Sequence, residues 1–521
     1  APCTLLCFET IRTMNKLLAL ISLFILFYGA ALGQQPRICG TDGEHAAQLE
    51  RLLVENKARL ARQPVLPRST QYVPVKFHLI ARNDGSGRVE ERVVLDDLCL
   101  LNEIFSEMDV QFYSKDGFNY IDNTAAFSDP VSTLNSILAF NKDANAMNVF
   151  VVGNADTGTN GEGVTLGFYS PSFDLVVINK SELGRSSKAL AHEAGHFFTL
   201  LHTHHGWDDA PWDLTIGNPS PSIAPGLPGN VRTEKVDGSN CEEAGDRVCD
   251  TPPDYNGLSW QNCEYNSGAR DPDSVLIDPD ERNIMSYFQN DVGGCRPMVF
   301  SDQQKSLMRT DLASPRRAFL RNEAAGFIPI EIDGPPELVS PLDGGEAPGG
   351  TGRVRLDWAR ADGATDYLVE IDRIASFSLQ PIRLMVKGTE VEVEDLDIGR
   401  RYFWRVRPWN EYRTCTDLTS EVQSFTVTDA TTAVNDIAFL EEWSFAPNPV
   451  RRNSELYVRF RTGRSFTGDV QLFNVTGQLV RQVGTTAFAP GANQVRVSTA
   501  DLSPGIYLLS LVAEGGRLTQ R

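Results

Sequence analysis

Five of the seven histidines in this chain lie within one fourteen-residue stretch, HEAGHFFTLLHTHH. If SSKALAHEAGHFF forms a helix capped by Ser186 or Ser187, then His192 and His196 lie one turn apart on one face. Two imidazoles at this spacing can bind a single metal ion. Glu193 then points in a neighbouring direction, where a carboxylate could accept a proton from a metal-bound water. The spacing therefore predicts a hydrolytic zinc site with one coordination position left open.

A third ligand has to come from outside this helix. An α-helix turns by about 100° per residue, so a continuous helix would carry His202 far around the axis. The spacing of His202 after HEAGH is that of the metzincin metallopeptidases, in which a glycine breaks the helix. Here Thr199 stands in place of that glycine. A left-handed conformation costs a β-branched residue roughly 1–2 kcal/mol, so either Thr199 accepts this strain or the chain turns by another path.

The sequence NIMSY provides the methionine turn that a metzincin has beneath its metal. Met285 is its apolar floor, and Tyr287 is placed to stabilise a developing oxyanion. With GDRVCDTPPD and CRPMVFSDQQKSLMR, these motifs resemble the pappalysin and cytophagalysin branch of the metzincins over about residues 72–325. The resemblance implies an α+β metzincin-like catalytic domain with a twisted mixed sheet, an active-site helix and a Met-turn. It also implies a zinc metalloendopeptidase that acts on protein or peptide substrates.

Secondary-structure patterns agree with such a domain. The alternating stretches QYVPVKFHLI, MNVFVV and FDLVVIN predict strands, and residues 95–108 predict a helix. GEGVTLGFYS is expected to be an edge strand along which an extended substrate peptide could pair. His204 and His205 are expected in a loop, as replacement ligands if Thr199 changes the register.

Residues 34–71 are polar and helix-prone, and RICGTDGEH resembles the start of the family's pro-segment. The resemblance implies that the Cys39 thiolate can occupy the open zinc position and keep a zymogen latent. A free thiol, or pairing with Cys99 or Cys415, is the alternative. Activation cleavage is expected after an arginine of this region, namely Arg59, Arg62 or Arg68.

Four further cysteines surround the methionine turn: Cys241, Cys249, Cys263 and Cys295. Four cysteines allow three pairings. The family resemblance favours two disulfides here, and the pairing expected is Cys241–Cys263 with Cys249–Cys295.

Clusters of aspartates offer the oxygen ligands that calcium prefers. They are Asp208-Asp209, Asp246 with Asp250 and Asp254, and Asp271 with Asp273. Related enzymes bind structural Ca²⁺, and solvated surface carboxylates explain the same residues equally well.

The N-terminus indicates export. Residues 14–33 carry a basic start, the apolar run LLALISLFILFYGAAL and small residues before a cleavage site after Gly33, which is typical of a signal peptide. Residues 1–13 are expected to be an upstream extension. No second apolar run of spanning length follows, so the mature protein is expected to lack an integral membrane segment. The net charge of −20 argues against nucleic acid as a partner.

Two all-β sandwich domains are expected after a linker rich in proline and glycine. Residues 336–427 resemble a fibronectin type III domain with a core that includes Trp358 and Trp404. Residues 440–521, with APNPV and DLSPGIYLLSLVAEGG, resemble the C-terminal sorting domain of the type IX secretion system. That resemblance implies recognition by outer-membrane secretion machinery and a place outside the bacterial envelope, in the medium or at the cell surface.

The domain order predicted is therefore 1–33, 34–71, 72–325, 336–427 and 440–521, in a secreted zinc endopeptidase made as a zymogen. Two alternatives remain at this stage. One is a secreted adhesin or binding protein with a structural zinc site, in which the ion has four protein ligands. The other is a gluzincin-like peptidase, in which a downstream glutamate replaces His202 as third ligand.

Overall fold

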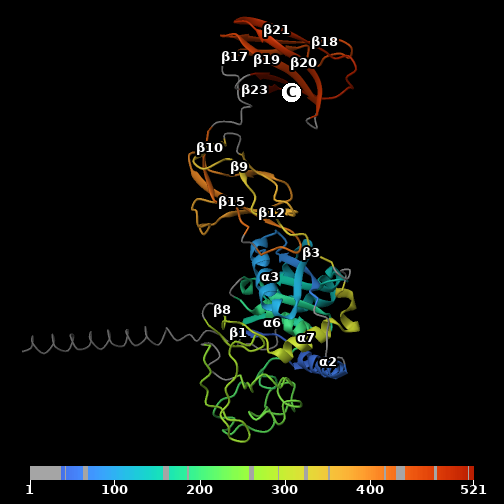
Figure 1. Cartoon of the computed structure of the whole chain (residues 1–521), viewed down its shortest axis with the longest axis vertical. Coiled ribbons are helices and arrows are strands. Elements are labelled where there is room, and N and C mark those ends of the chain that lie inside the picture. Colours follow the sequence, from blue (N-terminus) through green and yellow to red (C-terminus); the bar gives the residue numbers. More distant parts are fainter. Residues whose placement is uncertain are drawn as a thin grey trace, which may run out of the picture. The chain divides into compact units, whose positions relative to one another are not determined.

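The computed structural model describes residues 37–41, 43–62, 69–155, 164–184, 187–256, 263–290, 293–321, 327–349, 353–415, 418–429, 440–474, 478–513 and 516–520. The predicted upstream extension and signal peptide, residues 1–33, and the predicted cleavage site Arg68 lie outside these residues. Contacts divide the chain into two units, Ala1–Ile332 with Trp409–Asp417, and Asp333–Pro408 with Leu418–Arg521. Figure 1 shows the elements of both units.

A six-stranded sheet forms the centre of the first unit. Its strands, in spatial order, are β1 (Arg37–Cys39), β5 (Val164–Ser170), β6 (Leu175–Asn179), β4 (Met147–Val152), β2 (Gln71–Ala81) and β3 (Val110–Asp122). Neighbours pair in parallel except β5 and β6, which are antiparallel. The predicted strands correspond to β2, β4 and β6, whereas β3 was not predicted. This mixed sheet confirms the predicted fold class.

Helices and two short strands complete this unit. The helices are α2 (Gly43–Arg62), α3 (Glu91–Phe105), α4 (Thr124–Ser128), α5 (Ala139–Asn141), α6 (Ala189–Phe197) and α7 (Asp302–Leu312). Four 3₁₀ helices span Ser106–Met108, Val131–Thr133, Lys180–Glu182 and Pro315–Leu320, and a π-helical turn spans Leu134–Leu138. The short strands are β7 (Gln289–Asn290) and β8 (Gly293–Gly294).

Both faces of the sheet are buried, because side chains that alternate along each strand enter two separate cores. In β4, Val149 and Val151 pack with α3, α6 and α7, whereas Phe150 and Val152 pack with the short helices near Phe127. Strands that are covered on both faces are expected to be apolar at nearly every position, as MNVFVV is. The core that includes α6 supports the histidine cluster.

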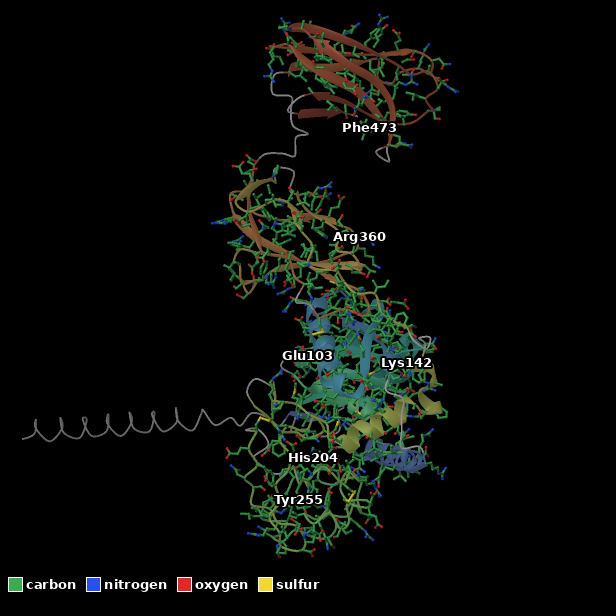
Figure 2. The ribbon with its side chains drawn as sticks, viewed as in Figure 1. Glu103, Lys142, His204, Tyr255, Arg360 and Phe473 are labelled. Carbon is green, nitrogen blue, oxygen red and sulfur yellow. A yellow bond between two sulfur atoms is a disulfide. The ribbon has the colours of Figure 1, made fainter. Side chains whose placement is uncertain are left out.

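The segment from α6 to β7 has a different construction. Within its described residues, turns and isolated bridges replace helices and strands, and Figure 1 draws it as green to yellow-green coil. A small aromatic cluster around Trp207 and Tyr255 provides its apolar core. Figure 2 labels Tyr255 and His204 in this part of the unit. Long irregular segments of this kind are uncommon in compact domains and are often functional.

All four cysteines of this region form disulfides, but the predicted pairing is wrong. Cys241 pairs with Cys249, and Cys263 pairs with Cys295. Consecutive backbone turns, from Asn240 to Glu243 and from Ala244 to Arg247, fold the first two cysteines toward each other. This local folding could not be read from the cysteine spacing.

Among the other cysteines that the structure describes, two form a disulfide and one is a free thiol. Cys99 lies buried in α3 and is bonded to Cys415, which belongs to the same unit. Cys39 is a buried free thiol. The alternative in which Cys39 pairs with Cys99 or Cys415 is therefore wrong.

The second unit contains two all-β bodies, as predicted. The first has a five-stranded and a three-stranded sheet, formed by β9 (Leu338–Ser340), β10 (Gly345–Pro348), β11 (Arg353–Trp358), β12 (Asp366–Asp372), β13 (Ile382–Val386), β14 (Glu390–Glu394), β15 (Arg401–Trp409) and β16 (Gln423–Thr428). Trp358 and Trp404 are both buried, as predicted for core residues.

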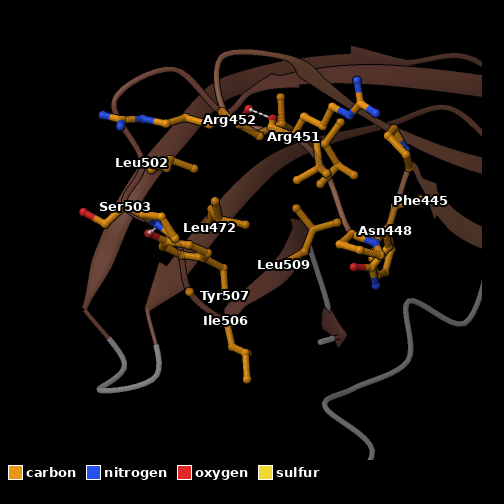
Figure 3. Close-up of a pocket in the computed structure, with 18 residues that line it drawn as sticks. Phe445, Asn448, Arg451, Arg452, Leu472, Leu502, Ser503, Ile506, Tyr507 and Leu509 are labelled. Carbon is orange, nitrogen blue, oxygen red and sulfur yellow. Dashed lines mark hydrogen bonds between the residues drawn. The ribbon is translucent and has the colours of Figure 1, made fainter.

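The C-terminal body also has two sheets, of three and four strands. They are formed by β17 (Leu440–Ala446), β18 (Glu455–Thr462), β19 (Phe466–Asn474), β20 (Leu479–Phe488), β21 (Gly491–Ser498), β22 (Tyr507–Ala513) and β23 (Gly516–Gln520). A pocket of about 620 Å³ opens between the APNPV turn and the SPGIY turn (Figure 3). The two motifs singled out in the sequence therefore lie side by side.

None of the helices in the described ranges is both long and apolar enough to cross a membrane.

Candidate metal centre

Helix α6 supplies the first two histidines of the cluster. It begins at Ala189, later than the predicted serine cap, and the Ser187 hydroxyl accepts a hydrogen bond from the Ala189 amide at 3.2 Å. Ser186 lies outside the described residues. His192 and His196 are one turn apart on α6, as predicted, and both are buried.

The helix breaks where the metzincin pattern places its glycine. Helix α6 ends at Phe197, and Thr199 adopts a left-handed conformation with φ of 76°. Of the two alternatives for this turn, the structure has the strained one. The strain of roughly 1–2 kcal/mol is accepted, because the turn redirects the chain and brings His202 back to the helix.

The three histidines converge through their Nε2 atoms. The Nε2 atoms of His192 and His196 are 3.2 Å apart, His196 and His202 are 3.0 Å apart, and His202 and His192 are 3.2 Å apart. Zinc–nitrogen bonds of about 2.0–2.1 Å in a tetrahedral site require ligand atoms at about this separation. The spacing fits one shared zinc ion.

The opposite ring nitrogens fix the tautomers. The Nδ1 atom of His192 faces the Ile284 carbonyl at 2.7 Å, and that of His196 faces the Leu200 carbonyl at 2.8 Å. The Nδ1 atom of His202 faces the Asp208 carboxylate. Because each Nδ1 meets an acceptor, each must carry the proton, which leaves three Nε2 lone pairs directed at one point. Such an arrangement could hold a cation.

Burial keeps these histidines neutral. It lowers the pKa of His196 to about 4 and the pKa values of His192 and His202 well below the ordinary value, and neighbouring imidazoles add to the shift of His192 and His202. Neutral imidazole is the form that binds a metal. The three side chains therefore remain available as ligands at neutral pH.

The predicted methionine turn lies beneath α6. Met285 is completely buried, and a Cβ atom built on Gly195 would lie only 2.3 Å from its sulfur. A glycine at this helix position lets the methionine approach the backbone closely. The neighbouring Ile284 carbonyl holds His192, so the turn both supports and orients the cluster.

Cys39 lies with the three histidines. Its sulfur and the three ring nitrogens all fall within 4.8 Å of one another, which makes a set of four atoms that could hold one metal ion. Burial and the nearby Glu193 carboxylate raise the pKa of the thiol well above its ordinary value. Without a cation the thiol therefore stays protonated.

Glu193 projects from α6 toward the N-terminal segment. Burial raises its pKa to about 8, although the Cys39 thiol and the Thr41 hydroxyl, 3.5 Å away, act in the opposite direction. On the sheet side, a Cβ built on Gly167 of β5 would lie 3.4 Å from the carboxylate. Glu193 thus lies between the histidine cluster and a strand backbone that approaches it closely.

Tyr287 contacts the backbone of Cys39. Its hydroxyl lies 3.2 Å from the Cys39 amide and 3.3 Å from its carbonyl. Its ring packs against His204 and His202. The structure thus brings together every residue predicted for the centre, from four separate parts of the chain.

The predicted edge strand GEGVTLGFYS corresponds to β5, and its first three residues lie outside the described ranges. Strand β1 pairs with β5 in parallel, and the Gly40 amide donates to the Gly167 carbonyl at 2.9 Å. The extended segment that pairs with this strand is the chain's own N-terminal part, and the pairing of a substrate there stays a prediction.

Asp208 is the partner of His202, whereas the sequence pattern placed this residue in a calcium cluster. The signal was a carboxylate six residues after the third histidine. His204 and His205 lie in the loop, as expected, but they are buried, and His204 lies near Asp208 and Asp254.

Three buried carboxyl groups gather in the irregular segment, only two of which were predicted. Burial, with the negative charges of Asp246 and Asp254, raises the pKa of Glu234 to about 10, and burial raises that of Asp246 to about 8. Asp254 accepts a hydrogen bond from the Thr203 hydroxyl at 2.7 Å, directly beyond His202. Asp250 and Asp273 are exposed, and Asp271 binds backbone amides in its own turn.

Comparison with known proteins assigns the C-terminal end. Residues 444–521 match the family model described as a secretion system C-terminal sorting domain. The match confirms the predicted export, to the medium or to the cell surface. No curated protein matches the chain.

Solved structures give more distant similarities. A mutant of Tannerella forsythia promirolysin is 18% identical, with a TM-score of 0.35, over 55% of this chain and 97% of that chain. The chicken CNTN1 FN1–FN3 domains are 12% identical, with a TM-score of 0.18, over 35% of this chain and 62% of that chain. FN3tt is 19% identical, with a TM-score of 0.15, over 19% of this chain and 99% of that chain.

The geometry of the site agrees with the resemblance drawn from the sequence. A broken helix brings three histidines together above a buried methionine, and a sorting domain follows at the C-terminal end. The chain is an exported protein that resembles the pappalysin and cytophagalysin branch of the metzincin metallopeptidases.

Proposed function

We propose that this protein is a secreted zinc-dependent endopeptidase that is made as a latent zymogen. The observation that carries the proposal is the convergence of three neutral Nε2 atoms beside a buried glutamate. His192, His196 and His202 would hold the zinc ion. Bound zinc supplies Lewis acidity, which lowers the pKa of a water molecule toward neutrality.

Glu193 is the general base in this proposal. Its carboxyl group faces the region of the cluster that Cys39 now fills, and its raised pKa of about 8 suits proton exchange near neutral pH. The Tyr287 phenol, released from the Cys39 backbone, would donate a hydrogen bond to the oxyanion that develops on the substrate. Met285 supports the ligands from below.

Latency would follow from the N-terminal segment. With β1 paired to β5, the Cys39 sulfur and the three histidine nitrogens form a set of four ligand atoms. A zinc ion held by all four would have no coordination position open for a water molecule. Cleavage after Arg59, Arg62 or Arg68 would release this segment. Strand β5 then becomes the edge of the sheet, and an extended substrate peptide could pair there.

Two further parts of the proposal concern ions and export. A structural calcium ion stays part of the proposal, because the predicted aspartate clusters offer the oxygen ligands that calcium prefers. The C-terminal domain would be read by the type IX secretion machinery in the outer membrane, as its family match supports.

The test uses the exported chain before and after processing. We expect about one zinc per chain in both forms and hydrolysis of casein only in the processed form. Cys39→Ser in the unprocessed chain should raise casein hydrolysis, because the thiol no longer fills the site. If the processed, zinc-loaded protein leaves casein and gelatin intact, the peptidase assignment is wrong.

His202→Ala separates the proposal from a gluzincin-like site. It should remove most of the zinc if His202 is the third ligand, and leave the zinc content unchanged if a downstream glutamate has that role.

A structural zinc site in a secreted binding protein is the second candidate. The four-atom set with Cys39 favours it, because closed four-ligand sites are typical of structural zinc. In that case the thiol remains a ligand in the mature protein, and Cys39→Ser should lower zinc affinity without producing hydrolysis.

A further inference from the structure

Thr199, the strained residue that breaks α6, has a partner from a distant part of the chain. Its hydroxyl accepts a hydrogen bond at 3.0 Å from the side-chain amide of Asn56, which lies on α2. Both side chains are buried, with 0% of Thr199 and 3% of Asn56 exposed. Water cannot replace this bond, so its loss would leave a buried amide hydrogen unpaired.

The second amide hydrogen of Asn56 connects the helix break to helix α7. It is donated to the Asp311 carboxylate on α7 at 2.9 Å. Asp311 in turn accepts from the Arg317 guanidinium at 2.9 Å, and Arg317 also donates to the Phe197 carbonyl. The last residue of the helix and the strained residue after it are therefore held by one buried network.

The turn is coupled directly to the metal ligands. The Leu200 amide donates to the Gly195 carbonyl at 2.9 Å, and the Leu200 carbonyl accepts from His196 Nδ1 at 2.8 Å. Two residues later the chain reaches His202. A change of the backbone at Thr199 would therefore alter the tautomer-fixing bond of one ligand and the position of another.

We propose that Asn56 is a positioning residue for the zinc site, because it holds the left-handed turn at Thr199 that brings His202 to the other two histidines. A glycine would adopt this turn without strain, whereas the threonine needs a partner for its hydroxyl. Helix α2 is part of the predicted pro-segment, and it also supplies the group that stabilises the site while the precursor folds. The inference rests on the zinc ligands of the proposed function and does not depend on hydrolysis.

The test measures metal affinity in the full, unprocessed chain by competition with a chelator. Asn56→Leu removes both donors at similar volume, and Thr199→Ala removes the hydroxyl but keeps the strained backbone. Each variant breaks the Asn56–Thr199 bond and should weaken zinc binding about tenfold, the loss expected for that one buried hydrogen bond. The absorption spectrum of the cobalt-substituted chain should change in both variants, because it reports the geometry of the ligands.

Rescue by glycine is the decisive arm. Thr199→Gly leaves one Asn56 amide hydrogen unpaired and should lower the unfolding temperature, but its zinc affinity should stay within about threefold of the natural chain, since the strain no longer exists. Asn56→Leu combined with Thr199→Gly should restore affinity to the same range. If the double variant binds as weakly as Asn56→Leu alone, Asn56 does not act through Thr199 and the proposal is wrong.

Asn148→Leu is the matched control. Asn148 is equally buried and its side chain makes several hydrogen bonds, but it lies on β4 and bonds His78 and the Asp143 turn. It should lower the unfolding temperature and leave zinc affinity and the cobalt spectrum unchanged. If Asn56→Leu leaves zinc affinity unchanged, only this inference is overturned. If the natural chain binds no zinc, the proposed function is overturned.

Discussion

The first unit contains two regions that are stabilised in different ways, and the candidate metal centre lies where they meet. The sheet with α3, α6 and α7 is held by apolar burial on both faces. The segment from α6 to β7 has a small aromatic core and depends on two disulfides, buried carboxyl groups and turn hydrogen bonds. The regular region provides two histidines and the glutamate, and the irregular region provides the third histidine and its carboxylate partner.

The difference shows that the histidines of the candidate site are positioned in two ways. A helix fixes the relative positions of His192, Glu193 and His196 through its own geometry. His202 has no such template, so its position depends on a strained turn and on Asp208. Changes in the regular region should therefore affect chemistry or core packing, and changes in the irregular region should affect stability and metal retention.

The largest effect is expected at Glu193. Glu193→Gln should lower casein hydrolysis by the processed protein at least about 100-fold, because general-base catalysis is lost, while zinc content stays the same. Zinc analysis of the same sample checks the second part. Glu182→Gln, a buried glutamate outside the cluster, is the control and should retain activity. Substantial hydrolysis by the Glu193 variant would contradict the assigned role.

The next largest effect is expected on stability, from a substitution in the packing beneath α6. Gly195→Ala is expected to lower the free energy of unfolding by about 1–3 kcal/mol, because the new methyl group overlaps the Met285 sulfur in a filled core. Chemical denaturation measures the change. In a Met285→Ala background the same substitution should cost less, since space is then available. Equal costs in both backgrounds would mean that the methionine does not impose the glycine.

The two disulfides of the irregular region should contribute unequally to the free energy of unfolding. The Cys263–Cys295 bond closes a loop with a sequence separation of 32 and the Cys241–Cys249 bond one of 8. Loop entropy predicts that replacing the first pair by serine costs about 1 kcal/mol more than replacing the second. Unfolding of the two double-serine variants measures this. The reverse order would show that loop entropy does not govern the region.

The smallest effect is a pH dependence in the irregular region. The folded-state pKa of Asp246 is about 8, above its unfolded value, so the folded state binds the extra proton between these values. Its contribution is present at low pH and is lost as the pH rises toward about 8. With calcium chelated, the unfolding temperature should therefore fall more steeply over this range in the natural chain than in Asp246→Asn. Added calcium should remove the difference, and a steeper fall in the variant would contradict the reasoning.

Much of the regular region could be predicted from the sequence. Strands β2, β4 and β6 are short apolar or alternating runs, and the pattern of residues 95–108 indicated α3. Strand β3 was missed because its second half, KDGFNYID, carries charges and a glycine in place of a clear alternation. Buried strands are recognised by composition, and an edge strand that is partly exposed lacks that signal.

The irregular region was predicted less well. The four cysteines were expected to form disulfides, but their pairing depends on turns whose hydrogen bonds are set locally. Glu234 was not noticed, because it joins Asp246 and Asp254 only through the folding of the loop. Its role as a buried acid has no signature in the residues beside it.

By itself, the sequence determined the chemistry of the centre: histidines at helical spacing, a glutamate between them, a third histidine at the metzincin distance and a methionine turn. The tertiary structure decided that Thr199 takes the left-handed turn, that Asp208 fixes the tautomer of His202, and that the Cys39 thiol lies at the cluster. The physical reason is the distance along the chain over which each feature is determined. Ligand spacing on a helix is a local property, whereas the stability of a strained turn depends on partners such as Asn56 that are distant in the chain.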